Sequence, residues 1–283
     1  MKKLVVVACL AVVFVLTMSA RAADLSAQEV VAKHLDAVGS KEKRDSITTI
    51  MAIGASEFES KTPVVKGGGR AIVVSDPDNL FWVISLNSRE YPFEKIGYFR
   101  DKVSLPFISA GTRSLLGSYL ADHSQILGDG LFGGVMSLRW TLLNLDKMKA
   151  RLSGGGIKKI DGRKLHAVEY NSQSGGGGSA NFAIKLYFDP ETFYHVRTEY
   201  RFEVTSREAT FGQQNQRSSA VVNLTEQFSD FKSIDGLTLP HKYNVTYATN
   251  SNTGMYENTW GIRVAEYRIN QKLQPDFFTF DVK

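Results

Sequence analysis

The pattern of apolar and polar positions first predicts a short helix near the start of the chain. Its apolar residues recur every three to four positions, as one face of a helix requires: Val30, Val31, His34, Leu35 and Val38. Ser26 and Glu29 before them have the S-x-x-E spacing of a capping box, and Gly39 after them suits a left-handed stop. We therefore expect an amphipathic helix of about three turns.

Between residues 46 and 106 the pattern changes to β-branched and aromatic runs that are separated by turn residues. Such runs are typical of successive antiparallel strands, here at residues 47–53, 70–75, 80–86 and 91–105. Asp76-Pro77-Asp78-Asn79 separates two of them, with proline fixing φ and Asp or Asn binding the backbone.

A helical period returns between residues 106 and 151, where two apolar stripes run over 115–127 and 131–145. Phe132, Met136 and Leu143 widen the second stripe until most of its circumference is apolar. A helix of that kind is buried on more than one side. We expect two helices here, separated by Gly128-Asp129-Gly130.

The C-terminal half reads as strand after strand. In the run 194–204, Tyr194, Val196 and Tyr200 share one predicted face, and His195, Arg197 and Glu199 share the other. Asp161-Gly162 and Asp235-Gly236 suit tight hairpin turns, and the glycines 175–178 suit a hairpin loop. With no alternating βαβ pattern, the order predicts one antiparallel α+β domain over residues 23–283.

The first 22 residues have the pattern of a secretory signal peptide. Lys2 and Lys3 precede the apolar run 4–16, and Ala20-Arg21-Ala22 provides a small-x-small cleavage site, so we expect cleavage near Ala22. An uncleaved anchor would need about 20 apolar residues. The chain's one cysteine, Cys9, lies inside this segment, and whether it could be lipidated stays open.

Composition then excludes some classes of function. The formal net charge of +5 falls to +2 without the signal peptide, because three basic residues lie there. No dense run of lysine and arginine remains, so we expect no nucleic-acid partner. With 43% hydrophobic residues and no cysteine in the mature chain, neither disorder nor a disulfide scaffold is expected.

Motifs for catalysis or metal binding are missing from the sequence. The five histidines have no H-x-x-x-H spacing, and we interpret four of them as surface residues of alternating strands. There is no G-x-S-x-G motif, and a predicted strand follows the glycines 67–69 where a phosphate loop requires a helix. The sequence predicts no catalytic residue, no metal and no cofactor.

The prominent feature is apolar. Aromatic residues and a methionine on the predicted strands and wide-faced helices either fill an ordinary core or line a cavity for a hydrophobic ligand. As candidate lining residues we select Phe81, Trp82, Phe132, Met136, Trp140 and Trp260, since aromatic and methionine side chains adapt to flexible chains.

Several segments resemble the periplasmic lipoprotein carriers of the LolA/LolB/RseB-like superfamily, above all the outer-membrane lipoprotein-sorting proteins. The similarity lies in the capped first helix with the following residues 37–43, in 69–82, in 160–170, in 186–192 and in the ending 276–280. The lid-latching arginine of these carriers is not placed on this chain, which is also longer than they are.

The resemblance implies an open half-barrel of roughly eleven strands, wrapped over a few helices, with an apolar cavity for acyl chains. It implies a periplasmic, monomeric, non-enzymatic carrier or chaperone whose partner is a lipidated protein, a lipid or another hydrophobic molecule, with an envelope membrane protein as a further partner. Two alternatives stay open: a module of the same fold that senses envelope stress or scaffolds, and, with less support, an exported hydrolase.

Overall fold

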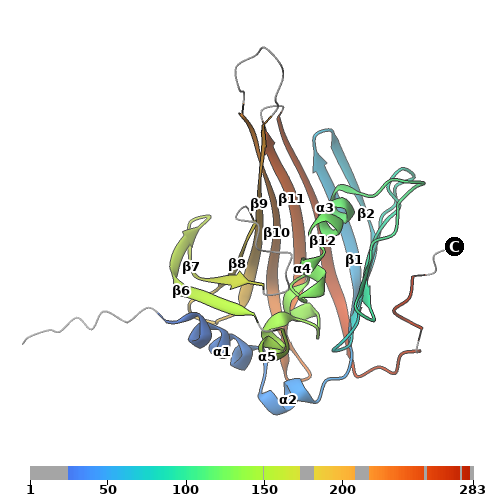
Figure 1. Cartoon of the computed structure of the whole chain (residues 1–283). Helices are drawn as coiled ribbons and strands as arrows, with labels where there is room; N and C mark the ends of the chain where they lie inside the picture. The colour runs from blue at the N-terminus through green and yellow to red at the C-terminus, as the bar shows by residue number, and fades with distance from the viewer. Residues whose placement is uncertain are drawn as a thin grey trace, which may run out of the picture.

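All strands of the computed structural model belong to one antiparallel sheet (Figure 1). The structure describes residues 25–148, 150–172, 182–207, 217–251, 254–274 and 276–280. The strands are β1 (Ile50–Lys61), β2 (Val64–Ser75), β3 (Leu80–Ser85), β4 (Phe93–Phe99), β5 (Lys102–Ser104), β6 (Arg151–Ile160), β7 (Arg163–Asn171), β8 (Phe182–Phe188), β9 (His195–Arg207), β10 (Arg217–Ile234), β11 (Leu237–Ser251) and β12 (Gly254–Ile269).

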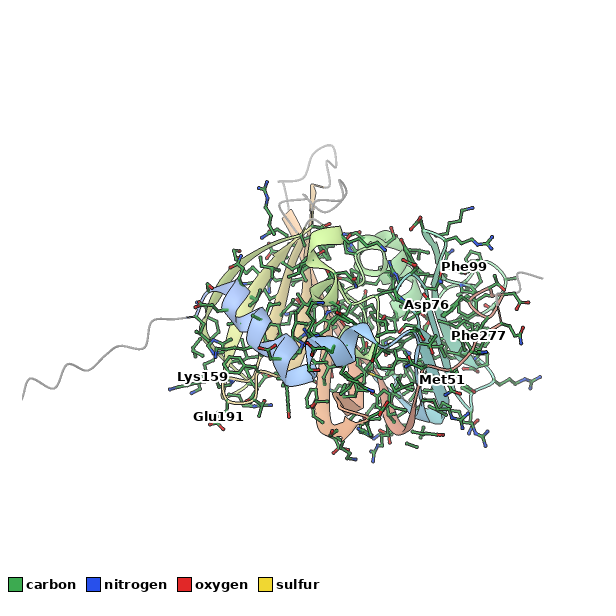
Figure 2. The ribbon with its side chains drawn as sticks, turned by 90° about the horizontal axis from the view of Figure 1, so that it is seen from below. Met51, Asp76, Phe99, Lys159, Glu191 and Phe277 are labelled. Atoms are coloured by element: carbon green, nitrogen blue, oxygen red, sulfur yellow. The ribbon has the colours of Figure 1, made fainter. Side chains whose placement is uncertain are left out.

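The sheet consists of two meanders that meet where the first strand pairs with the last. Its order is β5-β4-β3-β2-β1-β12-β11-β10-β9-β8-β7-β6, so β5 and β6 are free edges and the barrel stays open. Phe58 lies opposite Trp260 in the β1–β12 pair. Seen from below in Figure 2, Lys159 and Phe99, near the two edges, lie on opposite sides of the molecule. The predicted open half-barrel is confirmed, with twelve strands instead of roughly eleven.

The predicted first helix is confirmed as α1 (Ala27–Val38), and both hydrogen bonds of the Ser26–Glu29 capping box are present. A second short helix, α2 (Lys41–Asp45), follows it. Helix α1 packs against β6, β7 and β11, so it closes the lower end of the sheet near the β6 edge (Figure 1). In the described residues no helix has both the length and the apolar character to cross a membrane.

The segment 105–148 runs across the concave face of the sheet (Figure 1), and we call it the inner segment. It contains α3 (Leu115–Asp122), α4 (Gln125–Gly128), the 3₁₀ turns η1 (Gly134–Met136) and η2 (Thr141–Leu143), and α5 (Leu145–Met148). The predicted helix over 131–145 is therefore wrong. Gly130, Gly133 and Gly134 have φ of 68°, 86° and 49°, and backbone in that region cannot continue an α-helix.

The predicted tight turns are confirmed. Asp161 and Gly162 have φ of 47° and 82°, and Asp235 and Gly236 have φ of 49° and 78°, so both turns have two residues of positive φ. That backbone suits two-residue hairpins, because its twist matches the twist of the strands. The predicted signal peptide and the glycines 175–178 lie outside the described residues.

The predicted surface positions of four histidines are wrong, because all five histidines are buried. The clearest case is His195, which was placed on the water-facing side of its strand. Phe188 pairs with His195 but Tyr187 pairs with Arg197, so the register shifts at this point of β9. The extra residue of a β-bulge turns the side chain before it to the other face, and His195 becomes fully buried.

Candidate functional site

The concave face under the inner segment is the candidate site. Hydrogen bonds fix the inner segment both to the sheet and to itself. Near its start, Ser114 caps α3 through Gly117 N–H at 2.8 Å and donates to Glu94 Oε2 at 2.7 Å. Farther along, the buried guanidinium of Arg139 donates to two carbonyl oxygens at the end of α4, at 2.7 and 3.0 Å. Between Ser114 and Arg139 the segment covers the sheet with α3, α4, one 3₁₀ turn and loop.

Four of the predicted lining residues meet beneath the inner segment or belong to it. The rings of Trp82 and Phe132 are 5.0 Å apart, and Met136 and Trp140 are fully buried in the same apolar cluster. Trp260 is also buried in that cluster. The structure thus brings five of the six candidates to the concave side.

The sixth candidate, Phe81, lies on the opposite face of the sheet. Neighbouring residues of a strand point to opposite faces, so Phe81 cannot share a lining with Trp82. Its ring stacks on Phe280 at 4.7 Å and lies 5.3 Å from Phe277, where the C-terminal segment covers the sheet from outside. We leave Phe81 out of the proposed lining.

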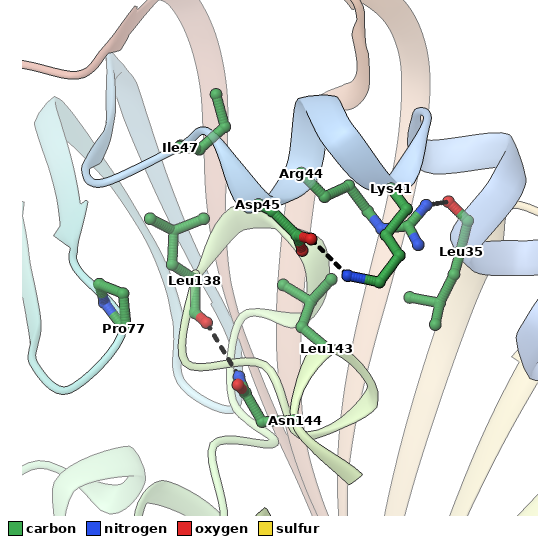
Figure 3. Close-up of a pocket in the computed structure, with 9 residues that line it drawn as sticks. All are labelled: Leu35, Lys41, Arg44, Asp45, Ile47, Pro77, Leu138, Leu143 and Asn144. Carbon is green, nitrogen blue, oxygen red and sulfur yellow. Dashed lines mark hydrogen bonds and ion pairs between the residues drawn. The ribbon is translucent and has the colours of Figure 1, made fainter.

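A pocket of about 330 Å³ opens where the inner segment meets α2 (Figure 3). None of the six predicted residues lines it. Its walls combine apolar side chains with a charged rim: Leu35, Lys41, Arg44, Asp45, Ile47, Pro77, Leu138, Leu143 and Asn144. In Figure 3 the Lys41–Asp45 ion pair lies on α2, and Leu138 and Leu143 belong to the inner segment. We call it the mouth pocket; its volume is at the lower end of the range for ligand sites.

Arg44 fixes the rim of the mouth pocket. Its guanidinium donates to the carbonyl oxygens of Leu35, at 2.5 Å, and of Gly39. These carbonyls lie at the C-terminal end of α1, where a cation is favourable, and Leu35 O also accepts from Gly39 N–H at 3.3 Å. Arg44 therefore stabilises the end of α1 and the entry to α2.

Deeper in the site, His34 from α1 and His195 from β9 surround Trp140. Both histidine rings lie 4.9 Å from the Trp140 ring. Burial lowers the pKa of His34 to about 4 and lowers that of His195 well below its usual value, so both rings are neutral near pH 7. His34 Nδ1 is 2.8 Å from Phe193 O, and His195 Nε2 is 2.9 Å from Thr198 Oγ1.

Four buried nitrogen atoms around the inner segment have no hydrogen-bond partner among the described residues: His34 Nε2, Trp82 Nε1, Trp140 Nε1 and His195 Nδ1. Most buried polar groups in folded proteins are paired, and an unpaired one costs about 1–3 kcal/mol. The inner segment thus makes some polar contacts with the sheet, such as Leu138 N–H to Ser75 Oγ at 2.9 Å, but it leaves these four nitrogen atoms unpaired.

Glu226 on β10 is the central polar group of the concave face. It is fully buried, and its carboxylate accepts hydrogen bonds from Tyr200 and Tyr243 hydroxyls, at 2.7 and 2.8 Å, and from Gly133 N–H at 2.7 Å. Burial raises the pKa of Glu226 to about 7, although the three donors act against that shift. Sequence motifs did not reveal this residue.

A second buried carboxyl lies near the start of α3. Glu94 accepts from Tyr91 Oη at 2.8 Å and from Ser114, and Trp260 Nε1 donates to Tyr91 Oη at 2.7 Å. Burial raises the pKa of Glu94 to about 7. Trp260, a predicted lining residue, is therefore held in a polar network as well as in the apolar core.

Among the described residues no group of three or more His, Cys, Asp or Glu side chains could hold a metal ion. The arrangement offers instead an apolar face with isolated hydrogen-bonding groups, which is the chemistry of a site for hydrophobic ligands.

Comparison with solved structures finds chains of related architecture. A LolA superfamily protein from Nitrosomonas europaea matches 91% of this chain and 99% of its own, at 12% identity and a TM-score of 0.48. An outer membrane lipoprotein-sorting domain assigned in Vibrio parahaemolyticus matches 89% and 97%, at 11% identity and a TM-score of 0.44. A DUF1329 family protein from Desulfovibrio piger covers the same shares, at 12% identity and a TM-score of 0.40.

The predicted resemblance is confirmed in that solved structures of the named superfamily are among these matches. No protein-family model matches the sequence, and no curated protein matches it. At 11–12% identity the likeness concerns architecture alone, so the ligand has to be inferred from the residues of this chain.

Proposed function

We propose that this chain is an exported, monomeric carrier or binding protein for lipidated proteins or other acylated ligands, and that it acts without catalysis. The acyl chains lie on the concave face, with Trp82, Phe132, Met136, Trp140 and Trp260 as lining. The observation that carries this proposal is the imperfect cover over that face: an apolar surface lies under short helices, turns and loop, and four buried nitrogen atoms there are unpaired among the described residues.

The energetics favour exchange of the inner segment for a ligand. Each methylene that leaves water contributes about 0.8 kcal/mol, so a long acyl chain can replace the apolar contacts of Phe132 and Met136. Each unpaired nitrogen lowers the stability of the closed state by about 1–3 kcal/mol. A ligand that both buries its acyl chain and supplies partners for these nitrogen atoms therefore competes with the inner segment for the concave face.

The mouth pocket is the proposed entrance. Leu138 and Leu143 of the inner segment form part of its wall. At its rim, Arg44 beside the Lys41–Asp45 ion pair leaves a net positive charge. An amphiphile can insert its chain between the leucines while its polar head stays near the charges. The signal peptide predicted in residues 1–22 supports export, and the family resemblance supports a periplasmic location.

The test measures bound lipid and uptake separately. Organic extracts of the purified mature protein are analysed by mass spectrometry, and uptake of a fluorescent fatty acid is titrated. Leu143→Asp in the mouth pocket should weaken uptake about tenfold or more, because a charge then lines the apolar entrance. Repeated absence of lipid from the extracts, together with no uptake by the wild type, would contradict the proposal.

A second candidate function, a module that senses or scaffolds through a protein partner, is favoured by two hairpin tips. Val64 is 75% and Met255 62% exposed, and the pairing of β1 with β12 places their hairpins at the same end of the sheet. Exposed apolar side chains at one end mark an interaction site. Met255→Arg should leave acyl uptake unchanged and weaken capture of an envelope membrane protein.

A further inference from the structure

The carboxylate of Glu226 is satisfied by donors from two different parts of the fold. Tyr200 and Tyr243 belong to β9 and β11, the strands on either side of β10. The third donor, Gly133 N–H, belongs to the inner segment and binds Oε1 at 2.7 Å. When the inner segment moves away, the tyrosines remain with the sheet and Oε1 loses one donor.

The backbone around Gly133 lies directly on aromatic side chains. A Cβ atom at Gly133 would stand 2.7 Å from Cζ2 of Trp82, and one at Gly134 would stand 2.9 Å from Cζ of Phe228 and 3.0 Å from Nδ1 of His195. Glycine is therefore required at both positions. At this point the concave face therefore packs against a backbone amide that carries no side chain.

The indole of Trp82 carries a hydrogen-bond donor near Gly133, whereas Glu226 carries an acceptor. Its ring touches the Gly133 position, and its Nε1–H has no acceptor among the described residues. Glu226 thus accepts from the Gly133 amide, and the indole ring that carries the unpaired donor packs against the same residue. The inner segment satisfies the acceptor and leaves the donor unpaired.

We infer that the concave site prefers acyl chains in amide linkage over acyl chains in ester linkage. The ligand's N–H takes the place of Gly133 N–H on Glu226 Oε1, and its carbonyl oxygen accepts from Trp82 Nε1. An ester has the carbonyl and lacks the N–H, so it leaves the Glu226 carboxylate with two donors instead of three. This inference rests on the proposed function, since it needs the acyl chain on the concave face.

The expected size of the preference follows from the loss of one of the three hydrogen bonds to a buried carboxylate, since Oε1 keeps the bond from Tyr243. That loss corresponds to a factor of about 10 or more in affinity. Sites that are built to bind an N–H or O–H reject the analogue without it more strongly than apolar pockets reject a missing methylene. A pure hydrocarbon chain of equal length should bind like the ester or more weakly.

The experiment compares two fluorescent probes with the same acyl chain, one joined by an amide and one by an ester, on the mature protein. The wild type should bind the amide about tenfold more tightly. Glu226→Leu should reduce the ratio of the two affinities to near one. If the leucine variant does not fold, Glu226→Gln is measured in its place and should lower the ratio without abolishing it, because a neutral amide oxygen accepts more weakly than a carboxylate.

Trp82→Phe is the matched variant, since both probes carry the carbonyl that Trp82 would bind. It should weaken both probes and leave their ratio unchanged. Equal binding of amide and ester to the wild type would overturn the inference while the carrier function stands. Binding of neither probe would overturn the proposed function itself.

Discussion

Replacing Glu226 by Gln should change how the stability of the protein depends on pH. The pKa of Glu226 is about 7 in the fold, against an ordinary value of 4.5. Because the folded value is higher, the native state binds more protons than the unfolded chain between these pH values. Its contribution to stability is therefore fully present below pH 4.5 and is lost as the pH rises to about 7.

The shift of Glu226 sets the size of the effect. The interval from 4.5 to about 7 corresponds to about 3 kcal/mol. Glu94, whose pKa is also raised to about 7, contributes with the same sign. Burial lowers the pKa of His34 to about 4, so its contribution has the opposite sign and is lost as the pH falls from 6.5 towards 4.

These opposed contributions make the wild-type profile a poor test, and the difference between variant and wild type isolates Glu226. Urea unfolding at pH 4.5, 5.5, 6.5 and 7.5 should show Glu226→Gln gaining about 3 kcal/mol relative to the wild type over this range. Glu90→Gln, at an exposed glutamate, is the control and should give a flat difference. A flat difference for Glu226→Gln as well would refute the desolvation of this carboxyl.

Further substitutions test how the inner segment is held. Gly130→Ala should lower the free energy of unfolding, measured in urea titrations, by about 2 kcal/mol or more, because φ is 68° and a Cβ would lie 2.0 Å from the Arg139 carbonyl oxygen. Gly128→Ala is the control: its Cβ would meet no atom within 4 Å, so its effect should be nearly neutral. Ser114→Ala should cost about 1–2 kcal/mol as a lost cap, against no measurable cost for Ser124→Ala, whose side chain makes no capping bond. Arg139→Met should lower the thermal midpoint by removing two hydrogen bonds to buried carbonyls.

The sheet could be predicted because its signals are local. Alternation of apolar and polar residues marks the strands, and the Asp-Gly pairs 161–162 and 235–236 mark tight turns that the structure confirms. The capping box of Ser26 and Glu29 likewise needs only three residues of separation. Local chemistry of this kind acts before the rest of the fold is known.

The inner segment could not be predicted in the same way. Its apolar spacing fits a helix, but Gly133 and Gly134 have positive φ, and their close contact with Trp82 and Phe228 leaves no room for a Cβ atom. His195 was misplaced because a single bulge in β9 reverses the alternation. In both cases a contact between distant parts of the chain decides the local conformation.

The candidate site escaped the motif search because its polar groups come from separate strands. Glu226 meets Tyr200 and Tyr243 across neighbouring strands, at separations of 26 and 17 residues, which no short motif contains. A different signal is present: Glu226 lies in the apolar phase of its strand, between Leu224 and Phe228. Glu94 stands likewise in phase with the buried Ile96. A buried charge needs donors from elsewhere in the fold, so a carboxylate in the apolar phase of a strand predicts a polar network even where its partners cannot yet be named.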